Sequence, residues 1–310
     1  MLTVAHLSDL HVTPVRVQQF RALRNKRVLG WLSWILRRRK HYRPEVLQAL
    51  IADLQETAPD HIVVTGDLIN ISLEEEFPAA VPWLHRFGPP DKVFIIPGNH
   101  DAYVSVPYTH SWRHWEAYLQ SDEAYQPESP SENGTGVAFP TVRIRDQIVF
   151  IGVNTALPPA PLFCATGQIG AQQLEKLEDL LRGFATVGLC RVVLIHHPPD
   201  EQVETRRRLI DAAAFRTVLW RTGAELVLHG HLHKSVFSSI PGPAGPIPVV
   251  GVRSSSAIGH KPRRRARYHV YTIETHPQDP QRFRITVDTR VYDRERHMFV
   301  PGRGRMLSML

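Results

Sequence analysis

Cysteine is scarce in this chain, whose 310 residues include only Cys164 and Cys190. Two cysteines do not make the disulfide framework of a small secreted domain, and these two lack the CxxC spacing of a zinc site. We therefore expect both thiols to be reduced and the protein to be cytoplasmic.

Long hydrophobic runs are missing as well. No apolar run approaches the roughly 20 residues that a membrane-spanning helix needs. The first apolar strand begins almost at Met1, so we expect no signal peptide. Because 43% of the residues are hydrophobic and no linker, repeat or low-complexity stretch divides them, one large core is expected. We expect a single domain over residues 1–310, with an insertion at residues 21–43 and a β-rich tail at residues 235–310.

Short apolar runs end in loops that carry Asp, Asn or His at five places, and we expect each run to be a strand. Asp9 and His11 follow the first run, Asp67 the second, Asn99, His100 and Asp101 the third, His196 and His197 the fourth, and His231 and His233 the fifth. Ligands bind at the carboxyl ends of strands in open α/β sheets. One Asp-x-His pair is weak evidence, but five such turns predict a shared site.

The remaining periodicity predicts an α/β protein. Helices are expected over residues 45–57, 74–87, 109–119, 168–184 and 206–220, and a hairpin over residues 137–144 and 148–153. In the tail, residues 236–240, 247–252, 268–274 and 283–291 predict successive strands of an antiparallel meander. An alternating first half followed by a β-rich tail predicts two facing sheets flanked by helices.

The ordered motifs resemble those of the calcineurin-like metallophosphoesterases. The motifs are Asp-x-His at 9–11, Gly-Asp at 66–67, Gly-Asn-His-Asp at 98–101, His-x-Pro at 196–198 and Gly-His-x-His at 230–233. The resemblance therefore covers most of the chain. It implies a four-layer αββα sandwich of two mixed β-sheets flanked by helices.

The resemblance also implies a ligand set for two divalent or trivalent transition-metal ions. Asp9, His11 and His233 would hold one ion, Asn99, His196 and His231 would hold the other, and Asp67 would bridge both. Oxygen and imidazole donors without a thiolate suit Mn, Fe or Zn. Two ions roughly 3.5–4 Å apart share a water and fix it for in-line attack on phosphorus.

Two further residues are expected to act in catalysis. His100 would contact a phosphate oxygen or protonate the leaving group, and Asp101 would orient the His100 ring. A packed histidine with satisfied hydrogen bonds is the alternative for His100. Within His196-His197 the resemblance favours His196 as the ligand.

The insertion at residues 21–43 is strongly basic. Its Lys and Arg residues are Arg21, Arg24, Lys26, Arg27, Arg37, Arg38, Arg39, Lys40 and Arg43, with no acidic residue among them. Val28, Trp31, Leu32 and Ile35 share one face of a short predicted helix between the basic ends. This composition is typical of an anchor lying on an anionic membrane surface. A cap helix packed on the protein's own core is the alternative.

The charge outside the insertion does not identify a binding partner. The net charge is +7, and residues 261–267 form a second basic run, which is either a phosphate-binding rim or a solvated loop. The sequence contains no recognisable nucleic-acid-binding module, so we do not expect nucleic acid as a partner. The oligomeric state is not predicted.

These features predict a metal-dependent hydrolase of a phosphodiester or pyrophosphate bond. The Trp-rich basic insertion favours an amphiphilic nucleotide-lipid substrate such as UDP-2,3-diacylglucosamine, reached at the inner membrane surface. A soluble cyclic-nucleotide phosphodiesterase, with the insertion as a cap or dimer contact, is the first alternative. A non-catalytic scaffold on the same fold is the second.

Overall fold

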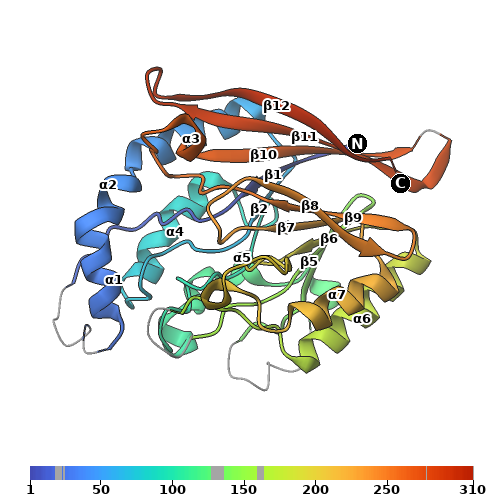
Figure 1. Cartoon of the computed structure of the whole chain (residues 1–310), viewed down its shortest axis with the longest axis horizontal. Coiled ribbons are helices and arrows are strands. Elements are labelled where there is room, and N and C mark those ends of the chain that lie inside the picture. The colour runs from blue at the N-terminus through green and yellow to red at the C-terminus, as the bar shows by residue number, and fades with distance from the viewer. Residues whose placement is uncertain (18–22, 24, 127–135, 159–163, 277, 310) are drawn as a thin grey trace.

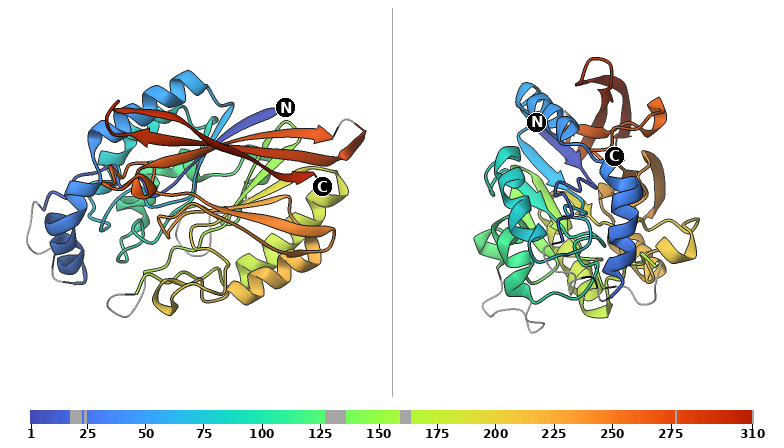
Figure 2. Two further views of the ribbon diagram at one scale, coloured as in Figure 1. Left: turned by 45° about the horizontal axis from the view of Figure 1, so that its top comes forward. Right: turned by 90° about the vertical axis from the view of Figure 1, so that its left-hand side faces the viewer.

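Two six-stranded β-sheets face each other in the structure, and helices cover their outer faces (Figures 1 and 2). The structure is a computed structural model that describes residues 1–310 except residues 18–22, 24, 127–135, 159–163, 277 and 310. Both sheets mix parallel and antiparallel strands. The predicted fold of two mixed sheets flanked by helices is confirmed.

The first sheet has the strand order β12-β11-β10-β1-β2-β3. Its strands are β1 (Leu2–Leu7), β2 (His61–Val64), β3 (Val93–Ile95), β10 (Arg267–His276), β11 (Asp279–Asp293) and β12 (Met298–Met309). Strands β1, β2 and β3 run parallel, so their carboxyl ends lie at one edge. Strand β10 adds to β1 in antiparallel fashion and continues into the β10-β11-β12 meander.

The second sheet has the strand order β4-β5-β6-β7-β9-β8. Its strands are β4 (Thr141–Arg145), β5 (Ile148–Gly152), β6 (Cys190–Leu194), β7 (Leu226–His229), β8 (Val236–Gly242) and β9 (Gly245–Gly251). Strands β5, β6, β7 and β9 run parallel. The predicted four-strand tail meander is therefore wrong. Strands β8 and β9 form a hairpin that joins this sheet through the pairing of β9 with β7, whereas β10 pairs with β1 and carries β11 and β12 into the first sheet.

Helices complete the outer layers because each buries one apolar side on a sheet. Helix α3 (Pro44–Thr57) has proline in its first turn and buries Val46, Leu47, Leu50, Ile51 and Leu54. It packs with α4 (Glu76–Phe87) against the first sheet, while α6 (Ala171–Thr186) and α7 (Ala212–Thr222) pack on the second. A third apolar cluster, with Val4, Val63, Phe94, Phe150 and Val192 among its members, fills the space between the sheets.

Two predicted helices are shorter than expected. Residues 109–119 form the 3-10 turns η3 (Tyr108–His110) and η4 (Trp112–Trp115), followed by α5 (Glu116–Leu119). The hydroxyl of Ser111 donates to the carbonyl of Pro107 at 2.9 Å and so competes with helical bonding there. The helix predicted over residues 206–220 begins only at Ala212, because Leu209 bridges Gly167 in extended form.

The insertion lies at the end of the molecule opposite α6 (Figures 1 and 2). It consists of α1 (Arg27–Ser33), the π-helix η2 (Trp34–Arg38) and α2 (Arg39–His41), while Arg21 and Arg24 lie outside the described residues. Trp31 and Trp34 pack on a small cluster of Val15, Ile71 and Leu73. Among the helices that the structure describes, none has the length and apolar character to cross a membrane.

The apolar face predicted for the insertion is divided between the core and the surface. The tryptophans face the protein, whereas Val28, Leu32 and Leu36 are 38%, 43% and 68% exposed. These three residues follow the i, i+4, i+8 spacing of one helix side. The insertion therefore has an inner face that packs as a cap does and an outer face that is apolar.

Candidate metal centre

The parallel register of β1, β2 and β3 brings three donor-bearing loops to one edge. Leu7 pairs with Val64, and Val64 pairs with Ile95, so Asp9, Asp67 and Asn99 follow strand ends that lie level. The loops also bind each other: the Asp9 N–H donates to the Gly66 carbonyl at 3.0 Å, and the His11 N–H donates to the Asp67 carbonyl at 3.0 Å. The site thus rests on a fixed backbone framework.

The backbone at the predicted ligands is strained. Asp9, His11, Asp67, His231 and His233 have φ between 44° and 67°, in the left-handed region. Residues with a Cβ rarely adopt this region, and each such residue costs of the order of 1–3 kcal/mol. Five of the seven predicted ligands carry this strain, which is the distribution expected when side-chain placement at a site outweighs backbone preference.

Two glycines let the loops approach this closely. Gly66 has φ 91°, and a Cβ there would lie 2.6 Å from the backbone nitrogen of Gly98. A Cβ at Gly230 would lie 1.9 Å from the Ser8 hydroxyl and 2.9 Å from Oδ2 of Asp9. A side chain at either position would push apart two of the loops that carry donors.

The first donor group contains Asp9, His11, Asp67 and His233, whose ligand atoms all lie within 4.8 Å of one another. Nδ1 of His11 lies 2.8 Å from the Ile69 carbonyl, which fixes the proton on Nδ1 and leaves the buried Nε2 without a hydrogen-bond partner. Oδ1 of Asp9 lies 3.2 Å from Nε2 of His233 but accepts no hydrogen bond. Buried donors left open in this way fit a metal ion.

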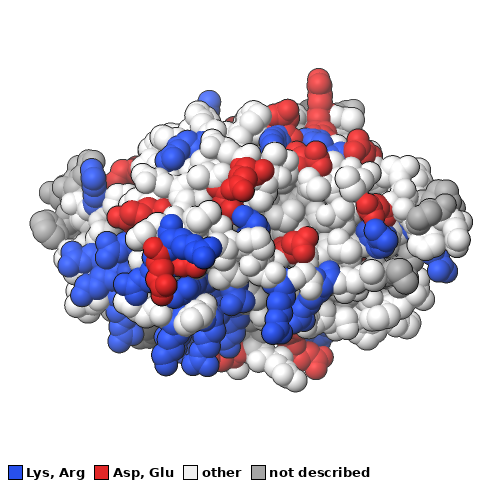
Figure 3. All heavy atoms as spheres, turned by 90° about the horizontal axis from the view of Figure 1, so that it is seen from above, with Lys and Arg blue, Asp and Glu red and all other residues white. Residues whose placement is uncertain are grey.

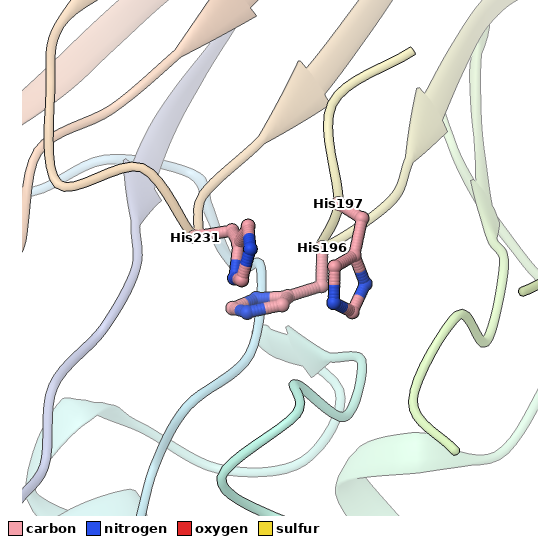
Figure 4. Close-up of side chains that lie close together, drawn as sticks. All are labelled: His196, His197 and His231. Atoms are coloured by element: carbon pink, nitrogen blue, oxygen red, sulfur yellow. The ribbon is translucent and has the colours of Figure 1, made fainter. Parts of the chain in front are cut away.

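The second donor group contains His196, His197 and His231, whose rings point toward one another from the loops after β6 and β7 (Figure 4). The predicted ligand Asn99 joins them, with Oδ1 lying 3.1 Å from Nε2 of His196 and 2.8 Å from Nδ1 of His231. The opposite ring nitrogens contact the carbonyls of Thr65 at 2.6 Å and Arg207 at 3.0 Å. Backbone acceptors thus orient both imidazoles toward Asn99.

His197 lies in this second group although it is not among the predicted ligands. Its Nδ1 lies 2.7 Å from the Thr155 hydroxyl, and its buried Nε2 has no hydrogen-bond partner. Its ring centroid lies 4.4 Å from that of His231. The His-His-Pro sequence alone does not show that both rings reach the same volume.

Asp67 links the two groups. It belongs to the first, and its Oδ2 lies 3.5 Å from Nε2 of His196 in the second. Burial alone would raise the pKa of the Asp67 carboxyl, but His196, His100 and His11 outweigh burial and hold that pKa well below its usual range. The same pairing raises the pKa of His196 to about 9 against the effect of burial. A buried carboxylate within reach of both donor groups is the arrangement required of a bridging ligand.

His100 and Asp101 both lie beside Asp67. The predicted contact, in which the Asp101 carboxylate orients the His100 ring, is not the one that this carboxylate makes. The backbone N–H of His100 donates to Oδ1 of Asp67 at 2.7 Å. The Asp101 carboxylate accepts the backbone N–H groups of Asp67 at 2.8 Å, Ile69 at 3.1 Å and Gly98 at 2.8 Å. Burial and the Asp67 charge raise the pKa of Asp101 to about 7. Asp101 therefore fixes the loops, and other residues orient the His100 ring.

The insertion brings to the site two residues that were not predicted from the sequence to lie there. Arg38 places Nη2 at 2.7 Å from Nε2 of His100, whose Nδ1 bonds the Asn70 carbonyl. The Tyr42 ring lies 4.4 Å from the His11 ring, and its hydroxyl lies 3.5 Å from Nδ1 of His233. The basic run contains Arg38 but gives no signal that separates it from its neighbours.

Comparisons with known proteins identify the family and the fold. The sequence matches the model of the calcineurin-like phosphoesterases over residues 2–235. No curated protein sequence matches the chain. A dimetal phosphatase from Danio rerio superposes with a TM-score of 0.63 at 10% identity, covering 100% of this chain and 99% of that one.

Two nucleotidases share the fold over part of their length. A 5'-nucleotidase precursor from Thermus thermophilus has a TM-score of 0.50 at 13% identity, and the NAD nucleotidase of Haemophilus influenzae has 0.50 at 12%. Each covers 99% of this chain, which spans 54% and 56% of theirs. Since the family match extends over well more than half of the residues, the chain belongs to the calcineurin-like phosphoesterase family.

Proposed function

We propose that the protein is a dinuclear metal hydrolase of a phosphodiester or pyrophosphate bond. Its family acts on phosphate esters such as nucleotides and uses two divalent metals. In our assignment Asp9, His11 and His233 hold one ion, and Asn99, His196 and His231 hold the other, with Asp67 shared. Two donor groups joined by one buried carboxylate are the observation that carries the proposal.

When bound, a pair of Mn, Fe or Zn ions supplies Lewis acidity and an activated water. The chain's own residues then set the geometry. Carbonyls of Ile69, Thr65 and Arg207 fix the ring orientation of His11, His196 and His231. The His100 N–H holds the Asp67 carboxylate in place. Each donor is positioned before substrate arrives, which lowers the cost of reaching the transition state.

The His100 ring is proposed to contact the substrate phosphate together with Arg38. Nδ1 faces a carbonyl and Nε2 faces a guanidinium, so Nε2 acts as an acceptor and the ring is neutral. Burial, followed by the Arg38 charge, lowers the pKa of His100 to about 3. A ring in this state has no proton on Nε2 to give to a leaving group, so of the two roles that the motif allows we keep phosphate contact, with Arg38 as the hydrogen-bond donor to the phosphate and His100 holding Arg38 in place.

The two faces of the insertion support the proposal that the substrate is amphiphilic and is reached from an anionic membrane. Its inner side delivers Arg38 and Tyr42 to the metal centre, while its outer side exposes Leu32 and Leu36 beside Arg37, Arg39 and Lys40. An apolar stripe with basic neighbours fits the headgroup region of a bilayer. A nucleotide-lipid such as UDP-2,3-diacylglucosamine would then have its pyrophosphate at the metals.

One observation favours a second candidate, a soluble cyclic-nucleotide phosphodiesterase. Trp31 and Trp34 pack on the protein's own Ile71 and Leu73, as they would in a cap that needs no membrane. A non-catalytic scaffold has weaker support, because all seven predicted ligand positions carry usable donors and they converge.

The test compares initial hydrolysis rates of Mn²⁺-reconstituted protein on UDP-2,3-diacylglucosamine and on cyclic AMP, with Asp67→Ala as the blank. Preference for the nucleotide-lipid supports the membrane-surface hydrolase. Preference for cyclic AMP makes the insertion a cap and the protein a soluble phosphodiesterase. Activity on neither substrate, with no turnover of bis(p-nitrophenyl) phosphate, would contradict the hydrolase.

A further inference from the structure

Three arginines come together where the chain passes from β9 to β10, and we call Arg253, Arg264 and Arg267 the arginine cluster. The Arg267 N–H donates to the Ser254 carbonyl at 3.3 Å, and the Ser255 hydroxyl donates to the Arg267 carbonyl at 3.0 Å. Between them, residues 257–266 form a loop closed by a bond of 2.7 Å from the Ala266 N–H to the Ala257 carbonyl. The backbone therefore fixes the cluster.

The arginine cluster adjoins the metal centre on one side and the insertion on the other. The Ser254 hydroxyl, next to Arg253, donates to the Asp9 carbonyl at 2.8 Å. Ala257 forms an isolated β-bridge with Tyr42, and the Ile258 N–H donates to the His41 carbonyl at 2.9 Å. One short segment thus contacts a metal-ligand loop and the insertion, and the cluster lies at its two ends.

The guanidinium groups of the cluster lack protein partners of opposite charge. The Nε atoms of Arg253 and Arg267 are buried and make no hydrogen bond. Within the part of the chain that the structure describes, no carboxylate lies within 4.0 Å of the three groups. Three other buried or half-buried arginines, Arg145, Arg191 and Arg290, do pair with a carboxylate, as Arg191 does with Glu225 at 2.7 Å. Buried donors without an acceptor are costly, so their retention calls for a ligand.

The three charges also repel one another. Burial, followed by Arg267 and Arg264, lowers the pKa of Arg253 to about 10. Seen from above, Lys and Arg gather densely toward the end of the molecule that carries the insertion, whereas the rest of this face is more sparsely charged (Figure 3). Like charges held together in this way attract an anion, and guanidinium forks match the oxygens of a phosphate.

We propose that Arg253, Arg264 and Arg267 form a phosphate-binding site separate from the metal centre. Its ligand is a phosphate group that is not the one hydrolysed, carried either by the same substrate molecule or by a lipid headgroup. The site binds this group by charge-assisted hydrogen bonds and does not depend on turnover. In the basic run at residues 261–267, Arg265 also has a buried Nε without a hydrogen-bond partner, but its charge acts on the pKa of Asp293 and not on that of Arg253, so it is left out of the cluster.

The test titrates Mn²⁺-loaded, full-length protein with methylenediphosphonate, which has no P–O–P bond to hydrolyse, in a calorimeter. We expect two sites, of which Asp67→Ala removes the one at the metals and Arg253→Gln/Arg267→Gln weakens the other by at least about tenfold. If Asp67→Ala loses its site but Arg253→Gln/Arg267→Gln binds as the unsubstituted protein does, the arginine cluster is refuted and the metal assignment stands. If Arg253→Gln/Arg267→Gln weakens its site but Asp67→Ala keeps both, the metal assignment is refuted and the arginine cluster stands.

A matched pair of variants covers the case in which the half-buried arginines are needed for folding. Arg263 and Arg264 are adjacent, exposed and in the same 3-10 turn, but of the two only Arg264 contributes to lowering the pKa of Arg253. Arg264→Glu is expected to weaken the second site by at least about fivefold, and Arg263→Glu by less than about twofold. Equal effects of the two substitutions would overturn the proposal.

Vesicles identify the molecule that carries the phosphate. They consist of phosphatidylcholine with and without phosphatidylglycerol. If Arg264→Glu weakens binding to the anionic vesicles more than Arg263→Glu does, the ligand is a lipid headgroup. If the two variants bind vesicles alike while methylenediphosphonate binding differs, the phosphate belongs to the substrate. Unchanged methylenediphosphonate binding overturns the site whatever the vesicles show.

Discussion

The guanidinium of Arg38 lies against the imidazole of His100, with Nη2 2.7 Å from Nε2 and Nη1 3.1 Å from Nδ1. Sixty-two positions separate the two residues in sequence. Arg38 has no carboxylate within ion-pair distance among the described residues, so its charge is available to an anionic substrate. The insertion thereby supplies a cation to a centre whose other residues come from strand ends.

Arg38→Ala is expected to lower kcat/KM roughly 10- to 100-fold, because a charge-assisted contact to the substrate phosphate is lost. Metal content should be unchanged, since Arg38 contacts none of the predicted ligands directly. Steady-state kinetics and metal analysis together check this prediction. The exposed neighbour Arg37 provides the control, and an equal loss in Arg37→Ala would show that general charge, not position, matters.

His100→Ala is expected to keep both metal ions and lose most of the rate, by about 10²- to 10⁴-fold. The backbone N–H of residue 100, which contacts Asp67, survives the substitution. Metal stoichiometry and kcat measured on the same sample decide the outcome. Loss of metal from this variant would mean that the ring is a ligand, and His110→Ala, at an exposed histidine, controls for nonspecific effects.

Replacing Arg37, Arg39 and Lys40 with Gln is expected to weaken sedimentation with anionic vesicles. All three are exposed, and each basic residue near such a surface contributes about 1 kcal/mol, so affinity should fall roughly 100-fold. Arg38 is left unchanged because it faces His100. Leu36→Asp should act in the same direction by disrupting the apolar stripe. Vesicle binding equal to that of the unsubstituted protein would remove the membrane-surface proposal.

The donor set could be predicted from sequence because its placement follows from strand ends. Asp9, Asp67 and Asn99 each come within four residues after a short apolar strand, and parallel pairing leaves these ends at one edge. The sequence pattern and the geometry of the sheet therefore both place these donor residues at the same edge. The ring orientations could not be predicted, because Ile69, Thr65 and Arg207 act through backbone carbonyls that carry no residue-specific signal.

The orientation of the insertion, in contrast, could not be predicted from the sequence. A helical wheel places Trp31 and Leu32 on one apolar face, but only packing on Ile71 and Leu73 decides which of the two turns inward. That choice also aims Arg38 at His100. The strands of the tail failed to follow prediction for a related reason. A β-pattern predicts a strand but not its partner, and β9 pairs with β7 whereas β10 pairs with β1.

His61→Phe is expected to lose less free energy of unfolding than the unsubstituted protein when the pH falls from 7 to 4.5. His61 is buried, neither ring nitrogen has a hydrogen-bond partner, and the ring stacks on Phe150 at 4.9 Å. Burial, followed by Arg145 and Arg143, lowers the pKa of His61 to about 3. The unfolded chain takes up this proton near pH 6.5, so between these two values it binds more protons than the folded state.

Stability from this residue is therefore present above pH 6.5 and lost as the pH falls toward 3. At pH 4.5 the loss amounts to about 3 kcal/mol at most. Urea unfolding of the unsubstituted protein, His61→Phe and the exposed-site control His85→Phe at pH 7 and pH 4.5 measures it. If all three lose the same free energy of unfolding between these pH values, His61 is not the cause.

The shared carboxylate of Asp67 is the central claim, and electron paramagnetic resonance of the Mn²⁺-loaded protein tests it most directly. We predict a spin-coupled signal from two ions in the unsubstituted protein, and its replacement in Asp67→Ala by the signal of isolated ions. A spin-coupled pair that persists in Asp67→Ala, or a single isolated ion in the unsubstituted protein, would contradict the dinuclear centre.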